Sequence, residues 1–177
     1  SPEAIIRCAN KVYLHNLLLH HNIPMPEAML LFRNKSTHYQ LLIDQLGLPI
    51  VLKIPDGSFS LGVKKAENIT ELRRISEELF EQSAVIIAQR YYYTEMDWRV
   101  GIFNQRPLFA CQYFMAKNHW QVVNYNHGRV DDGDHITLGV QNAPKEVVKL
   151  ALRSTKLMGN DLYGVDIKVV NDKPMVI

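Results

Sequence analysis

Residues 49–62 read PIVLKIPDGSFSLG, a run of apolar residues that leads into a loop of small residues. Lys53 lies inside the apolar run, which is apolar enough to be a strand buried on both faces. A buried ammonium group needs an anionic partner, because desolvating an isolated charge is strongly unfavourable. The loop offers backbone amides and hydroxyls to an anion, through Gly57, Ser58, Ser60 and Gly62. The stretch therefore predicts phosphate binding, and the alternative is an edge-strand lysine whose ammonium reaches water.

The pattern on either side of this stretch predicts alternating strands and helices in the first half of the chain. Asn68 and Glu71 form a capping box in front of one of the helices. The expected elements are a helix over 3–20, a strand over 28–32, a helix over 36–46, a strand over 49–54, a helix from 68, and a strand over 84–90.

The second half predicts hairpins and one helix. The expected elements are paired strands over 97–104 and 107–115, a strand over 120–125, a loop over 126–142, a helix from Pro144 to Gly159, and a last hairpin from 162 onward. We therefore expect two lobes that meet near residue 90.

Residues 163–169, YGVDIKV, alternate so that Asp166 and Lys168 share one face of a strand. A turn centred on Asp172 would place Asp166 opposite the residue that follows Ile177. Cross-strand neighbours have Cβ atoms about 5 Å apart, close enough to share a hard cation. The pattern indicates a metal ligand at Asp166, and the alternative is a solvated carboxylate paired with Lys168.

Asp97 and Arg99 are two residues apart and share a strand face, where they could form a surface ion pair. Gln89-Arg90-Tyr91-Tyr92 lies where the lobes are expected to meet. Its backbone could hold a planar base, or it could be an ordinary aromatic strand end.

The composition excludes several classes of protein. Of 177 residues, 47% are apolar and 21% charged, with a net charge of +2 and no basic stripe for nucleic acid. Cys8 and Cys111 are isolated, which suits a reducing compartment. Neither a signal segment nor an apolar run of about 20 residues is present. We expect a cytoplasmic protein that uses neither membrane nor nucleic acid, with oligomeric state, a homo-oligomer included, left open.

Five short motifs, in this order, resemble ATP-grasp ligases, and among them the RimK-like peptide and protein glutamate ligases. They are Asn10-Lys11, residues 49–53 with the following loop, Gln89-Arg90-Tyr91-Tyr92, Asp97-Trp98-Arg99 and Gly164-Val165-Asp166-Ile167. The resemblance covers nearly the whole chain. It implies an α+β ATP-grasp fold, two α+β lobes with ATP held between them. The implied parts are an entry helix and connector (1–24), a small lid lobe (25–88) and a large lobe (89–177).

The resemblance also implies a role for each matching residue. Lys11 and Lys53 would contact the ATP phosphates, under the loop that carries Gly57, Ser58 and Ser60. Residues 89–92 would hold adenine, Arg90 and Tyr91 through their backbone. Asp97 would contact the nucleotide, Arg99 the phosphate or acyl-phosphate, and Asp166 would bind Mg²⁺ or Mn²⁺. Relatives often carry an arginine in the strand through residues 111–114, and here Lys117 is the nearest cation that could replace it.

The implied activity is an ADP-forming ligation of a carboxylate to an amine through an acyl-phosphate, with an amino acid, peptide or protein as substrates. The family's metal site also uses a glutamate and an asparagine on the strand that begins before Ile177. The chain is therefore expected to be an inactive piece of a larger ligase whose large lobe is cut before that strand is complete. The alternatives are a nucleotide-binding pseudo-enzyme or regulatory module, and an RNA-binding domain.

Overall fold

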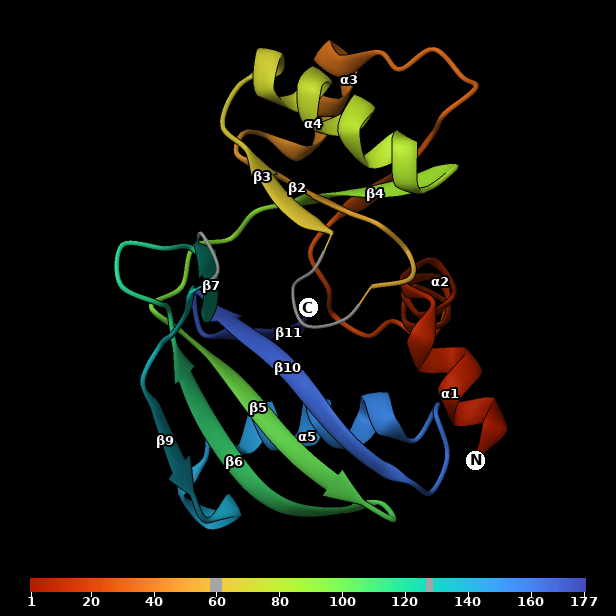
Figure 1. The fold of residues 1–177 in the computed structure, drawn as a ribbon. Helices are drawn as coiled ribbons and strands as arrows, with labels where there is room; N and C mark the ends of the chain where they lie inside the picture. Colours follow the sequence, from red (N-terminus) through yellow and green to blue (C-terminus); the bar gives the residue numbers. More distant parts are fainter. Residues whose placement is uncertain (58–61, 127–128) are drawn as a thin grey trace. The chain divides into compact units, whose positions relative to one another are not determined.

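The computed structural model describes residues 1–57, 62–126 and 129–177. The helices are α1 (Pro2–Ala9), α2 (Lys11–His20), α3 (Tyr39–Leu46), α4 (Ile69–Gln82), the short 3-10 helix η1 (Val140–Asn142) and α5 (Lys145–Thr155) (Figure 1). The strands are β1 (Ala28–Phe32), β2 (Ile50–Lys53), β3 (Val63–Ala66), β4 (Val85–Arg90), β5 (Met96–Phe103), β6 (Arg106–Phe114), β7 (Val123–Asn126), β8 (Arg129–Asp132), β9 (His135–Leu138), β10 (Leu162–Val170) and β11 (Lys173–Val176).

The chain divides into two compact units. We call residues 6–16 and 26–92 the four-stranded unit, and residues 1–5, 17–25 and 93–177 the five-stranded unit, after the larger sheet in each. Among the described helices none has the length and apolar character of a membrane span.

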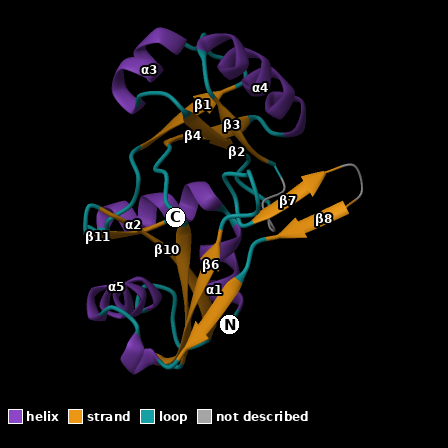
Figure 2. Cartoon of the chain, turned by 90° about the vertical axis from the view of Figure 1, so that its left-hand side faces the viewer, coloured by secondary structure: helices purple, strands orange, loops and turns teal. Residues whose placement is uncertain are grey.

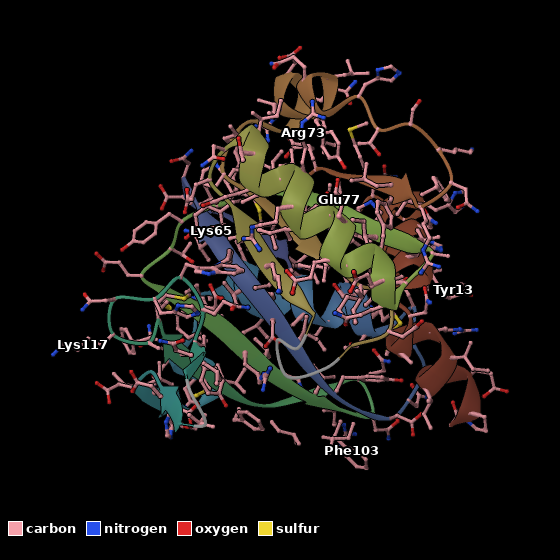
Figure 3. The ribbon with its side chains drawn as sticks, turned by 45° about the horizontal axis from the view of Figure 1, so that its top comes forward. Tyr13, Lys65, Arg73, Glu77, Phe103 and Lys117 are labelled. Carbon is pink, nitrogen blue, oxygen red and sulfur yellow. The ribbon has the colours of Figure 1, made fainter. Side chains whose placement is uncertain are left out.

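The four-stranded unit is an antiparallel sheet in the order β1-β4-β2-β3, with α3 and α4 on one face (Figure 2). Asn68 caps α4 as expected: its side chain accepts from the Glu71 amide at 2.9 Å, and Glu71 accepts in turn from the Glu67 amide at 2.8 Å. Figure 3 shows Arg73 and Glu77 on the solvent face of α4. The opposite face of α4 packs into the core, whose fully buried members include Leu42, Ile50, Leu52, Leu72, Leu79 and Ile86.

Two expectations for the first half were wrong. The helix over 3–20 is two helices, because the Asn10 side chain accepts from the amides of Val12 and Tyr13 and starts a new helix. The sequence pattern also missed β3, whose residues VKKA carry two lysines and lack a clear apolar alternation. It pairs with β2 in a register that places Lys53 opposite Val63.

The five-stranded unit is an antiparallel sheet in the order β11-β10-β5-β6-β9, with α5 along one face (Figure 1). Alternation explains the packing: Trp98, Val100 and Ile167 are buried, together with Val147 and Ala151 of α5. The intervening positions of β5 and β10 form the opposite face of the sheet, which we call the polar face. They are charged or glycine except at the strand ends, where Phe103, Leu162 and Val170 lie.

The second half also departs from expectation in the segment after β6. The strand expected over 120–125 is β7, which begins later, and the segment expected to be a loop over 126–142 contains β8, β9 and η1. Because β9 extends the main sheet by pairing with β6, its His135 lies opposite Tyr113.

The predicted register of the last hairpin was wrong by one residue. Asn171 and Asp172 both have positive φ, at 49° and 60°, as a two-residue hairpin turn of the primed type requires. Val170 therefore pairs with Lys173, and Ile167 pairs with Val176. The Ile177 amide donates to the Asp166 carbonyl at 3.1 Å, so Ile177, and not the residue after it, lies beside Asp166.

Candidate functional site

The start of α2 is joined to the beginning of the glycine-serine loop. The Lys11 backbone amide donates to Pro55 O at 3.0 Å, and the Lys11 ammonium donates to the carbonyls of Pro55 and Gly57. Asn10 Nδ2 donates to Asp56 Oδ1 at 2.8 Å. These contacts place the Lys11 charge at the start of the loop, beside Pro55 and Gly57. Ser58 and Ser60, which were expected to contact phosphate, lie outside the described residues.

Three basic side chains belong to this region of the four-stranded unit. Lys53 ends β2 half-buried, directly before the loop. His15 follows Lys11 by one helical turn, and its pKa is lowered by burial and then by the Lys53 charge. Burial also lowers the pKa of Lys11, and Asp56 opposes that effect. Concentrated positive charge in a partly buried place favours binding of a polyanion.

The end of β4 is held by Glu27. Gln89 lies inside the ladder between Ala28 and Val51. The Arg90 amide donates to Glu27 O at 2.8 Å and its guanidinium lies 3.4 Å from Glu27 Oε2, while Tyr92 Oη donates to the same carboxylate at 3.0 Å. The Arg90 backbone was expected to hold adenine, and its amide is already hydrogen-bonded within the unit.

Tyr91 carries the ammonium of Lys65 over its ring, 4.8 Å from the centroid. Lys65 comes from β3, and its place beside Tyr91 could not be expected while that strand was missing from the prediction. The pair sets a cation and an aromatic face side by side, a combination that suits a nucleotide.

The polar face of β5 and β10 carries four charged residues that we call the charge quartet: Asp97, Arg99, Asp166 and Lys168. The register pairs Arg99 with Asp166 directly across the two strands. Lys168 lies one step further along, opposite Asp97. Acids and bases therefore alternate along each strand and across the pair. The sequence placed Asp97 with Arg99, and Asp166 with Lys168, on one face of each strand. The alternatives in which Asp166 pairs with Lys168 and Asp97 with Arg99 are contradicted by the structure, which pairs Arg99 with Asp166 and Lys168 with Asp97.

Asp97 and Lys168 form the more buried of the two ion pairs. Lys168 Nζ lies 2.6 Å from Asp97 Oδ1, and their side chains are 12% and 14% exposed, in that order. Thr94 Oγ1 donates to the same carboxylate at 2.9 Å and accepts from Lys168 at 2.6 Å. Burial raises the pKa of Asp97, and the charge and hydrogen bonds of Lys168 and Thr94 oppose the rise.

Arg99 and Asp166 form a bidentate pair. Arg99 Nε donates to Asp166 Oδ1 at 2.6 Å and Nη2 donates to Oδ2 at 2.8 Å, so both carboxylate oxygens are engaged. The bonds to Asp166 raise the pKa of Arg99, which keeps its charge. The guanidinium also lies 5.2 Å from the centroid of the Tyr113 ring on β6.

Asp166 offers one partly exposed carboxylate to a divalent cation. Within residues 1–57, 62–126 and 129–177, no three acidic, histidine or cysteine side chains gather closely enough to hold a metal ion by themselves. Mg²⁺ is commonly held by one or two carboxylates together with phosphates and waters, so Asp166 fits that role as one ligand. Lys117, expected as a catalytic cation, is exposed and points away from the chain around it (Figure 3).

Three contributors to the site were missed because their contacts are not local in sequence. His15 lacked any signal beyond its spacing from Lys11. Lys168 had a signal, since it is a basic residue on the same strand face as Asp166, but its partner on β5 depends on sheet order. Tyr113 lies on the strand where the resemblance implied an arginine, and there it supports Arg99 instead.

Comparisons with known proteins identify the family to which the chain is similar. The family model of the RimK-like ATP-grasp domain matches residues 8–177. The alpha-aminoadipate–LysW ligase LysX of Saccharolobus solfataricus is 25% identical over 98% of this chain and 61% of the relative. A protein named probable alpha-L-glutamate ligase from Haemophilus influenzae is 25% identical over 94% of this chain and 53% of the relative.

Solved structures show the same fold. A D-alanine–D-alanine ligase from Bacillus anthracis superposes with a TM-score of 0.80 at 22% identity, covering 99% of this chain and 57% of that one. The same enzyme complexed with ATP gives a TM-score of 0.74. The chain thus spans about half to three-fifths of these proteins. With a match that extends over residues 8–177, it belongs to the RimK-like ATP-grasp domain family and has the α+β ATP-grasp fold.

Proposed function

We propose that this chain is the nucleotide-binding part of an ADP-forming ligase that joins a carboxylate to an amine. The observation that carries the proposal is the family match over residues 8–177. The proposal concerns a protein of the length of the relatives, since the chain covers about half to three-fifths of them.

In this proposal the four-stranded unit binds the nucleotide. Lys11 and Lys53 neutralise the phosphates beside the start of the loop, and His15, whose lowered pKa keeps its ring neutral, can offer them a hydrogen bond. The end of β4, with Tyr91 beside Lys65, receives the adenine. ATP binding at these residues would account for a lysine kept half-buried at the end of an apolar strand.

The five-stranded unit would handle the transferred phosphoryl group. Asp166 supplies a carboxylate oxygen to Mg²⁺, which would neutralise phosphate charge when bound. Arg99 stabilises the negative charge on the phosphoryl group as it passes from ATP to the substrate carboxylate. The amine then attacks the acyl-phosphate, an amide or peptide bond forms, and phosphate leaves. Lys117 is kept as a candidate second cation.

For the acyl or amine substrate, we propose an amino acid, glutamate or a related acidic one, added to a peptide or protein. The support is the names of two relatives, which refer to alpha-aminoadipate and to alpha-L-glutamate, both acidic amino acids. For the 177-residue chain alone we propose nucleotide binding without turnover, because Asp166 is a single carboxylate and the described residues hold no larger acidic cluster.

Calorimetric titration with ATP tests the proposal. Lys53→Ala should lower ATP affinity at least tenfold, because a charge-assisted contact between a desolvated ammonium and phosphate is lost. Lys35→Ala is the matched control, since Lys35 is an exposed lysine of the same unit whose ammonium lies over Phe32. Its affinity should be unchanged, and circular dichroism should show both variants folded. Equal ATP affinity of wild type and folded Lys53→Ala would overturn the assignment.

A further inference from the structure

The engagement of both Asp166 oxygens by Arg99 has a consequence for metal binding. A cation can approach Asp166 only by taking an oxygen that already accepts a hydrogen bond from the guanidinium, at 2.6 or 2.8 Å. Arg99 also brings a full positive charge to the same carboxylate. Resting on the proposed function, we propose that Arg99 is a latch on Asp166: it occupies the metal-binding carboxylate until metal displaces it, and only then is it free to bind phosphate.

The geometry of β5 and β10 makes this exchange a local event. Arg99 and Asp166 are direct cross-strand partners, so the pair forms without any movement of the sheet. Both side chains are partly exposed, at 44% and 38%, so solvent can replace either partner. A rotation of the Arg99 side chain is sufficient to open the carboxylate.

The Tyr113 ring can hold the Arg99 guanidinium after it leaves Asp166. Its ring already lies 5.2 Å from the guanidinium carbon, on the other side from Asp166. A cation–π contact stabilises the cation through the face of the ring and leaves guanidinium N–H groups available for an anion. Arg99 can therefore leave Asp166, stay over the sheet, and direct its donors at an anion.

The neighbouring pair is unsuited to the same exchange. Lys168 and Asp97 are 12% and 14% exposed, and Thr94 contacts both. Opening this pair would leave a largely buried charge without its counter-ion, which is strongly unfavourable. The quartet thus contains one fixed pair and one exchangeable pair.

The latch predicts that metal and phosphate help each other to bind. Metal at Asp166 frees Arg99 for an anion, and an anion that attracts Arg99 frees Asp166 for metal. Such coupling is reciprocal by thermodynamic linkage. It would prevent either ligand from being held firmly without the other.

Paramagnetic broadening by Mn²⁺ tests the proposal and detects even weak binding. Backbone amide resonances of residues 164–167 are followed by NMR as Mn²⁺ is added, with and without ATP. Arg99→Met should require about three- to tenfold less Mn²⁺ than wild type for half-maximal broadening in the absence of ATP, the range expected for losing a partly exposed bidentate pair. Asp166→Asn should abolish the broadening.

A second variant separates the latch from simple charge repulsion. Arg99→Lys keeps the positive charge but lacks the planar fork that engages both oxygens. The latch predicts an affinity for Mn²⁺ between those of wild type and Arg99→Met, whereas pure repulsion predicts no change from wild type. Arg106→Met removes an exposed arginine of the same unit and should behave as wild type.

The outcomes distinguish the latch from the proposed function. If wild type, Arg99→Lys and Arg99→Met respond to the same Mn²⁺ concentration while wild type still binds ATP, the latch is refuted and the proposed function stands. If Mn²⁺ broadens nothing near Asp166, even with ATP, the latch and the metal assignment are both refuted. If wild type binds no ATP, the proposed function fails, whereas the metal titration alone still decides whether Arg99 competes for Asp166.

Discussion

Replacing Lys168 by methionine removes the counter-ion of the most buried carboxylate in the charge quartet. At 2.6 Å and an effective dielectric constant of about 20, the attraction between the two charges is roughly 6 kcal/mol, of which desolvation offsets a large part. Loss of one partner of a fully buried pair destabilises a protein by about 3–5 kcal/mol. Asp97 keeps 14% exposure and its Thr94 hydrogen bond, so we expect a lower cost of about 2–3 kcal/mol at pH 7.

The cost of Lys168→Met should depend on pH. Burial already holds the pKa of Asp97 above its ordinary value of 3.8, so this group makes the folded state bind more protons than the unfolded state above that pH. Without Lys168 the folded pKa rises further. Below pH 3.8 the carboxyl is protonated in both states and its contribution vanishes. The destabilisation relative to wild type should therefore be small near pH 4 and grow as the pH rises to 7.

Thermal and urea unfolding at pH 4.5 and pH 7 measure this effect. For a chain of this size, 2–3 kcal/mol corresponds to a fall in Tm of about 5–10 °C at pH 7. Lys149→Met is the control: Lys149 pairs with Glu146 on the surface of α5, with side chains 66% and 68% exposed, and should change stability by less than about 0.5 kcal/mol. A cost for Lys168→Met that is equal at both pH values, or equal to that of the control, would refute the reasoning.

Two further predictions concern local structure. Asn10→Ala removes the acceptor for two α2 amides and the contact with Asp56, and should lower stability by about 1 kcal/mol in urea unfolding. Asn10→Ser keeps a capping acceptor without placing a second carboxylate beside Asp56, and should recover part of the loss. Asp172→Gly should raise stability by about 0.4–1 kcal/mol because Asp172 has φ of 60°. The same change at Asp161, which is not among the positive-φ positions and whose carboxylate pairs with the Ser1 ammonium, should not raise it; equal effects at both would contradict the turn assignment.

The sequence predicted the helices and strands whose signals are local. Asn68 and Glu71 marked the start of α4, and strict alternation marked β10. The sequence analysis failed where a strand forms only because a partner strand far away in the sequence offers it an edge. The segment VKKA gives no alternating pattern, and becomes β3 because β2 offers it a free edge. β9 likewise forms on the edge of β6.

The strand faces of the charge quartet were easier to predict than its ion pairs. Asp97, Arg99 and Asp166 were placed on sheet faces correctly, because alternation along a strand is fixed by backbone geometry. Which acid meets which base depends on how β5 and β10 are aligned, and no feature within either strand specifies it. The register at Ile177 was wrong for a related reason: a two-residue and a three-residue turn at Asn171 differ by one position in pairing.

The described residues before and after positions 58–61 are held by hydrogen bonds to other residues of the unit. The Ile54 amide donates to Gly62 O at 3.0 Å, and α2 holds Pro55 and Gly57 through Lys11. The described residues Gly57 and Gly62 are therefore each held by a contact with another part of the unit. Substitutions at positions 58–61 would leave both of these contacts in place, so a combinatorial library could vary those four positions while these anchors are preserved.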